Sequence, residues 1–209
     1  MSWLSLTLVG AISLLSFSQN VTRAQSPAEP IKAKRRELSY QIQPDGSKVL
    51  KQERTGTFYR SSSGAEIRTT GDRSTFIDAQ GHIYEINHID KFVKLVAHNH
   101  ITPHELIRQL VRTMEPDTKS SITLHGFTGY ETVNGVNCAV LPIRSNDKPP
   151  GKEYLYLPYG LSMKTEEFAN PEGSLLTIWE LYDIQVAEPD PALVRIPEGY
   201  FIDNTLQQQ

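Results

Sequence analysis

The chain carries several short segments in which hydrophobic and polar residues alternate, the pattern of half-buried β-strands. The clearest of these segments are residues 55–60, 66–70, 74–78, 82–87 and 91–97. Turn-forming residues separate them at short and regular intervals. This spacing predicts an antiparallel meander, in which successive strands pair through tight turns.

Four turn signals support this interpretation. They are Pro44-Asp45-Gly46, residues 61–64, residues 78–81 and Asn134-Gly135. Glycine and asparagine tolerate the positive φ angles of hairpin turns, and Asn-Gly is the strongest short hairpin signal. Because no strand–helix–strand alternation accompanies these turns, the chain is predicted to be mainly β.

One segment has the character of a helix. Thr102, Pro103 and Glu105 form a capping box with proline at the first helical position. The apolar residues that follow lie on one helical stripe, namely Leu106, Ile107, Leu110, Val111 and Met114. We therefore expect one helix, from Pro103 to about Met114, packed on a curved antiparallel sheet that forms an open half-barrel.

Residues 173–186 form the longest strand candidate, and both faces of this strand are partly apolar. Two explanations stay open. One face packs while the other lines a concave cavity, or two packed layers bury both faces. In the first case the candidate ligand-binding residues are Trp179, Leu181, Tyr156 and Phe58, of which Trp179 and Leu181 share a strand face. In the second case all four residues belong to an ordinary core.

The N-terminal residues 1–24 are predicted to be a secretory signal peptide, because their apolar run is uncharged and shorter than a bilayer span. A retained N-terminal anchor is the alternative. Residues 25–36 are punctuated by proline and then basic, which indicates a flexible basic leader. A single β-rich domain is expected over residues 37–204, with a tail at 205–209. We expect a periplasmic or extracellular protein whose mature chain has no transmembrane span.

Composition narrows the classes of function. The 209 residues carry a formal net charge of −3, and acidic and basic residues are interspersed. A nucleic-acid-binding surface would need a concentrated basic stripe, so no nucleic-acid partner is expected. Cys138 is the single cysteine, which rules out an internal disulfide. Its thiol is predicted to be buried beside Val136 and Val140.

Three of the six histidines, His98, His100 and His104, lie close together in the sequence. Such a triad could hold a zinc ion together with a water molecule. No cysteine or carboxylate stands in an obvious fourth position, so no metal site and no cofactor are predicted. Nucleophile elbows, phosphate-binding glycine loops and C-x-x-C motifs are also absent, and no catalytic residue is assigned.

The register of the hairpin expected over residues 82–98 bears on the same question. The pairing that places Ile83 opposite Val96 gives favourable cross-strand pairs throughout. It sends His82 to the face opposite His98, because a shift of one residue exchanges the two faces of a strand. His82 is therefore not expected to join the other histidines.

The sequence resembles a group of uncharacterised secreted bacterial proteins, whose recurring pieces lie within residues 55–200. The most specific piece is the ending E-P-D-P-x-L…(I/V)-P-x-G-Y at residues 188–200. Val194 replaces the usual phenylalanine at one expected buried contact. This resemblance implies no established activity. The layout is more distantly similar to periplasmic lipoprotein carriers, open half-barrels whose concave face holds acyl chains, and this similarity transfers no functional residues.

These observations favour an exported, non-enzymatic module that binds a lipid-like or other apolar ligand in a concave sheet. An envelope protein that binds another protein through a sheet edge or face is the first alternative. A metal-dependent hydrolase built on His98, His100 and His104 is the second.

Overall fold

The computed structural model describes residues 28–98, 126–143 and 147–205. The described residues form one sheet of 12 strands. In chain order the strands are β1 (Ile31–Ile42), β2 (Lys48–Arg60), β3 (Glu66–Thr70), β4 (Arg73–Ile77), β5 (His82–Asn87), β6 (Phe92–His98), β7 (Gly129–Val133), β8 (Val136–Ile143), β9 (Gly151–Tyr156), β10 (Leu161–Phe168), β11 (Leu175–Val186) and β12 (Phe201–Asp203). Two short 3-10 turns, η1 (Leu157–Tyr159) and η2 (Pro191–Leu193), complete the described structure.

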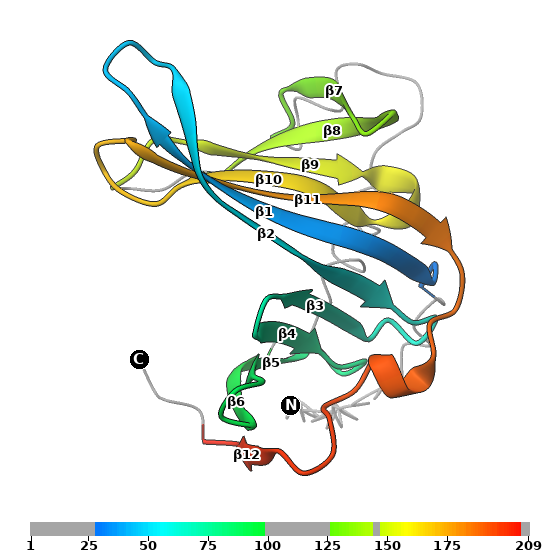
Figure 1. Cartoon of the computed structure of the whole chain (residues 1–209). Coiled ribbons are helices and arrows are strands. Elements are labelled where there is room, and N and C mark those ends of the chain that lie inside the picture. Colours follow the sequence, from blue (N-terminus) through cyan, green and yellow to red (C-terminus); the bar gives the residue numbers. More distant parts are fainter. Residues whose placement is uncertain (1–27, 99–125, 144–146, 206–209) are drawn as a thin grey trace, which may run out of the picture.

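The sheet is open and almost wholly antiparallel. Its strand order is β12-β6-β5-β4-β3-β2-β1-β11-β10-β9-β8-β7, and the two ends of this order do not pair. Only β12 runs parallel to its neighbour, β6. Figure 1 shows the long strands β1, β2 and β11 at the centre, with β3 to β6 on one side and β7 to β10 on the other. The prediction of a mainly β, open antiparallel sheet is confirmed.

All four predicted turns connect paired strands. They join β1 to β2, β2 to β3, β4 to β5 and β7 to β8. Asn134 and Gly135 have φ angles of 48° and 80°, so both occupy the left-handed region that a type I′ hairpin turn requires. The sequence signals at these turns therefore reflect real backbone requirements.

The sheet curls at its β7 end. The register shifts by one residue between β1 and β11 and again between β9 and β10, and such bulges bend and twist a strand. The β7–β8 turn reaches back over the sheet, where the Asn134 side chain donates a 2.7 Å hydrogen bond to the Leu181 carbonyl. Because β11 lies three strands away from β8 in the sheet order, this contact requires strong curvature.

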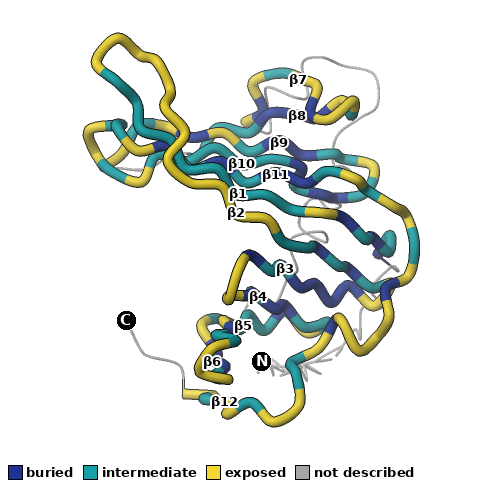
Figure 2. Tube along the Cα trace, in the orientation of Figure 1, coloured by how far each residue is buried: buried dark blue, intermediate teal, exposed yellow. Residues whose placement is uncertain are grey.

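The two larger apolar clusters lie in the two halves of the sheet, whose buried residues are dark blue in Figure 2. The first contains Ile31, Ala33, Phe58, Val133, Cys138, Val140, Tyr154, Leu161, Met163 and Leu181. The second contains Ala65, Ile67, Phe76, Ile86, Val93 and Val194. The Cys138 side chain is fully buried, as predicted, and its burial raises the pKa of the thiol to about 11. The thiol therefore stays protonated at neutral pH and acts as a small apolar group.

The C-terminal segment crosses the β3–β6 side of the sheet before it pairs with β6 (Figure 1). Val194 is buried in the second cluster despite its small size, and Ile196 and Tyr200 pack against the same cluster. The Tyr200 hydroxyl lies 2.9 Å from His88 Nδ1, and His88 Nε2 lies 2.7 Å from Ser74 Oγ. These contacts attach the C-terminal segment to the sheet.

The folded part of the chain begins before residue 37, where the predicted leader gives way to the domain. Ala28 is buried and its backbone N–H donates to the Ser62 carbonyl, and β1 begins at Ile31, which is fully buried. Lysine and arginine residues within residues 32–36 resemble a solvated tail in the sequence. They lie instead on the central strand β1, where their aliphatic stems can cover apolar neighbours.

The predicted opposite orientation of two histidines is wrong. The expected register holds over most of β5 and β6, but a bulge shifts it at the end of the hairpin. Ile83 pairs with Ala97 instead of Val96, and His82 therefore faces His98, with ring centroids 4.8 Å apart. The helix predicted from Pro103 to about Met114 lies outside the described residues.

Gly56 on β2 lies opposite Thr70 on β3, at a position with no room for a side chain. A Cβ atom at this position would lie 1.8 Å from the Thr69 carbonyl oxygen. We expect Gly56→Ala to separate β2 from β3 and to lower the free energy of unfolding by about 2–3 kcal/mol, the usual cost of overpacking. Urea denaturation followed by circular dichroism measures this loss. Thr55→Ala, at an exposed neighbouring position, is the control, and an equal loss in both variants would show that no close approach exists.

Candidate functional site

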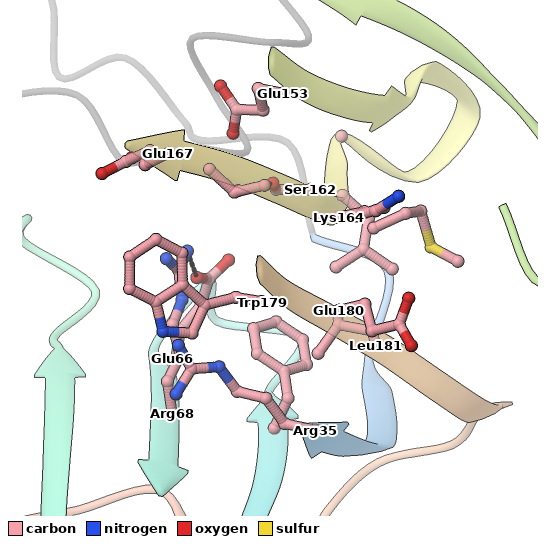
Figure 3. Close-up of a pocket in the computed structure, with 15 residues that line it drawn as sticks. Arg35, Glu66, Arg68, Glu153, Ser162, Lys164, Glu167, Trp179, Glu180 and Leu181 are labelled. Carbon is pink, nitrogen blue, oxygen red and sulfur yellow. Dashed lines mark hydrogen bonds and ion pairs between the residues drawn. The ribbon is translucent and has the colours of Figure 1, made fainter. Parts of the chain in front are cut away.

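A cavity of about 330 Å³ opens on the sheet between the β1–β3 strands and the β9–β11 strands (Figure 3). Its apolar lining consists of Phe58, Leu161, Met163, Trp179 and Leu181. Its charged lining consists of Arg35, Glu66, Arg68, Glu153, Lys164, Glu167 and Glu180. The cavity therefore combines an apolar floor with charged walls.

Packing fixes the base of this cavity. Phe58 lies opposite Ala33 of β1, and Leu181 lies opposite Arg35 of β1. Phe58 and Leu181 are almost fully buried, so their positions are fixed, while Trp179 beside them is half-buried.

Arg60 lies behind one end of the cavity, where it contacts the lining residues Glu66 and Gly160. Its side chain is fully buried, and it donates hydrogen bonds to three backbone carbonyls, those of Glu29 (2.9 Å), Tyr159 (2.7 Å) and Gly160 (3.1 Å). Arg60 belongs to β2, whereas Gly160 directly precedes β10, and two strands separate β2 from β10 in the sheet. The guanidinium thus connects two parts of a curved sheet that do not pair.

Glu66 supplies the charge that makes the burial of Arg60 possible. It lies opposite Arg60 in the β2–β3 register, and its carboxylate is 3.7 Å from Arg60 Nη1. The same carboxylate accepts a 3.0 Å hydrogen bond from Arg68. A buried charge is tolerated only when it is paired and hydrogen-bonded, and here one carboxylate serves two guanidinium groups.

Arg35 lines the cavity beside this network. Its guanidinium donates a hydrogen bond to the Thr70 hydroxyl. Among the described residues no carboxylate lies within ion-pair distance of it. Burial, and in second place the positive charge of Arg68, lower the pKa of Arg35 to about 10. At neutral pH the Arg35 guanidinium stays charged although it is partly removed from water.

Trp179 forms part of the apolar wall. Its indole Nε1 donates a 3.1 Å hydrogen bond to the Glu37 carboxylate, which also lies 3.9 Å from Arg54. Glu37 and Trp179 are direct partners in the β1–β11 register. The hydrogen bond orients the ring beside the cavity, where Trp179 is half-buried.

The opposite wall, on β9 and β10, carries negative charge. Glu153 and Glu167 line the cavity there, and in the described structure neither carboxylate has an ion-pair partner. Figure 3 shows both on the far side of Trp179 from Arg35 and Arg68. The two carboxylates that have no ion-pair partner in the described ranges thus lie on one wall together with Lys164, whereas Arg35 and Arg68 lie with Glu66 on the other.

Three of the four residues predicted to bind a ligand, Phe58, Trp179 and Leu181, line this one cavity. Their role as ligand contacts stays a prediction. Tyr156 is not among the lining residues and instead packs edge-on against Tyr159, with ring centroids 4.9 Å apart. Tyr156 is the last residue of β9 and therefore lies at the end of its strand.

The charged residues of the site were not among the residues predicted from the sequence to bind a ligand. Arg35 lay within the supposed leader. Arg60 and Glu66 flank the predicted turn at residues 61–64, and opposite charges directly across a hairpin are a signal for a cross-strand pair. Their burial, however, depends on the distant residues of η1 and could not be inferred from this spacing.

The histidine cluster is only partly described. His98 lies at the end of β6 beside His82, whose Nδ1 is 2.6 Å from the Asp78 carboxylate. His100 and His104 lie outside the described residues. Among the described residues no group of three or more His, Cys, Asp or Glu side chains could hold a metal ion. Within the same ranges no helix is long and apolar enough to cross a bilayer.

The Arg60 network gives a test of the site's construction. We expect Arg60→Met to lower the free energy of unfolding by about 3–5 kcal/mol, because it leaves buried carbonyls and part of the Glu66 charge unsatisfied. Arg54→Met is the matched control on the same strand. Arg54 is exposed and its single ion pair is long, so we expect a loss below about 1 kcal/mol. Urea denaturation measures both, and similar losses would contradict the assigned role of Arg60.

No protein-family model matches the chain, and no curated protein matches it. Among solved structures, an uncharacterized conserved protein from Thermus thermophilus has the same fold, with a TM-score of 0.50 and 10% identity over 85% of this chain and 91% of that protein. The chain is less similar to MucB, with a TM-score of 0.39 and 15% identity over 84% of this chain and 60% of MucB. A LolA superfamily protein from Nitrosomonas europaea gives a TM-score of 0.26 and 8% identity, over 81% and 91% of the two chains.

Proposed function

We propose that this protein is an exported, non-enzymatic module that binds an amphiphile, with the apolar chain of the ligand in the cavity between β1–β3 and β9–β11. The observation that carries the proposal is the cavity of about 330 Å³ with an apolar floor of Phe58, Met163 and Leu181. This volume lies at the lower end of the range of about 300–1,000 Å³ for ligand sites, and suits a single chain rather than a bulky lipid.

Burial of the chain would supply most of the binding free energy. Each methylene group that leaves water contributes about 0.8 kcal/mol before the costs of association. The floor residues are already fixed by packing, so little side-chain entropy is lost on binding. The proposed function requires no chemical step.

A sheet edge gives a second candidate function, the binding of another envelope protein. β12 is a short strand at the edge of the described sheet, where no other described strand pairs with its outer side, and Phe201 is 68% exposed although it stacks on Phe92. An extended segment of a partner could pair with such an edge through its backbone. This function becomes the better candidate if the cavity takes no chain.

Trp179 makes the first proposal directly measurable. The sequence has two tryptophans, Trp3 and Trp179, so a chain that begins at Gln25 carries Trp179 alone. Bromine atoms quench tryptophan fluorescence only at short range. We expect brominated fatty acids and brominated monoacylglycerols to quench Trp179 in a saturable manner, whereas the unbrominated chains do not.

Matched variants locate the bound chain. We expect Leu181→Gln to weaken the saturable quenching at least about tenfold, because it places an amide on the apolar floor. Leu193→Gln changes an exposed leucine on η2 and leaves the quenching unchanged. Circular dichroism verifies that both variants fold. Absence of saturable quenching with every brominated probe, or equal effects of the two substitutions, would contradict the proposal.

A further inference from the structure

One wall of the cavity, the cationic wall, carries the guanidinium groups of Arg35 and Arg68. The Glu66 carboxylate lies beside them, 3.0 Å from Arg68 and 3.7 Å from the buried Arg60. Glu37 also acts on Arg35, but its carboxylate is hydrogen-bonded to Trp179 and lies close to another arginine. Among the described residues, Arg35 therefore has no carboxylate within ion-pair distance.

Arg35 is the group with the greatest unused capacity. A guanidinium has five N–H donors in a planar fork, which matches a carboxylate or phosphate with two parallel hydrogen bonds. The described structure gives Arg35 one side-chain hydrogen bond, to the neutral hydroxyl of Thr70. Arg68 lines the same cavity, and its positive charge contributes to the lowered pKa of Arg35, so the two guanidinium groups can act on one anion.

The apolar floor adjoins these donors. Arg68 lies opposite Phe58 in the β2–β3 register, and its guanidinium carbon is 5.9 Å from the centre of the Phe58 ring. Arg35 lies opposite Leu181 in the β1–β11 register. Each arginine of the wall is thus a direct neighbour of an apolar floor residue, and an anionic group next to an apolar chain would contact both.

We infer that the ligand is an acidic amphiphile, whose carboxylate or phosphate head is held by Arg35 and Arg68 while its chain lies on Phe58 and Leu181. This inference rests on the proposed function and adds the chemistry of the head group. The carboxylates of Glu153 and Glu167 lie on the opposite wall, where they disfavour an anion in the reversed orientation. Charge on the two walls thereby fixes the direction in which the ligand enters.

The test compares ligands that share one chain and differ in the head. Dodecanoate, dodecyl phosphate and dodecanol are titrated into the chain that begins at Gln25 by calorimetry, below their critical micelle concentrations. We expect at least one of the two anions to bind about tenfold or more tightly than dodecanol, the difference expected of a charge-assisted hydrogen-bonded pair. The anion that binds more tightly shows whether the site prefers a carboxylate or a phosphate head group.

Arginine variants assign the preference to the cationic wall. We expect Arg35→Met to reduce the preference for the anion over dodecanol to about threefold or less. Arg195→Met removes the same charge from an exposed position near the C-terminus and leaves the preference intact. Arg68→Met is a second variant that keeps the test decisive if Arg35→Met does not fold, since Glu66 still has Arg60 as its partner.

The outcomes separate the inference from the proposed function. Binding of dodecanol and both anions with equal affinity would overturn the acidic head group and leave the chain-binding function in place. A preference that persists in Arg35→Met and Arg68→Met would overturn the assignment to this wall. Failure of all three ligands, together with no quenching of Trp179, would overturn the proposed function itself.

Discussion

The buried guanidinium of Arg60 is the interaction on which the shape of the sheet depends. An open sheet of 12 strands has no closure to fix its curvature, and β2 and β10 do not pair. Arg60 spans them by donating to the carbonyls of Tyr159 and Gly160, and Glu66 balances its charge. A cation in this position is stable only while every one of these partners stays in place. The curvature of the sheet follows from that requirement.

The same network gives the cavity its chemical character. Because Glu66 is shared between Arg60 and Arg68, it cannot also neutralise Arg35. Arg35 thus keeps a charge without a close carboxylate next to an apolar floor, and the low local dielectric strengthens its attraction for an anion. A structural need, the burial of Arg60, thereby produces a recognition element.

The sequence predicted the local features of this fold better than the distant ones. Turns such as Asn134-Gly135 are encoded within a few residues, and the structure confirms them. The basic run that contains Arg35 was assigned to a leader, because charge density alone does not distinguish a solvated tail from a strand whose charges line a cavity. The pairing of His82 with His98 depends on a bulge, and alternation cannot reveal the extra residue. The cavity itself depends on which strands become neighbours, which only the complete topology defines.

Native mass spectrometry of the mature protein, purified from its own host without detergent, would reveal a ligand bound in the cavity. We expect a second species that is heavier than the bare chain by the mass of one acidic amphiphile. This species should disappear in Leu181→Gln and persist in Leu193→Gln. Bare protein alone, or an adduct of unchanged intensity in Leu181→Gln, would contradict the assignment of this cavity as the binding site.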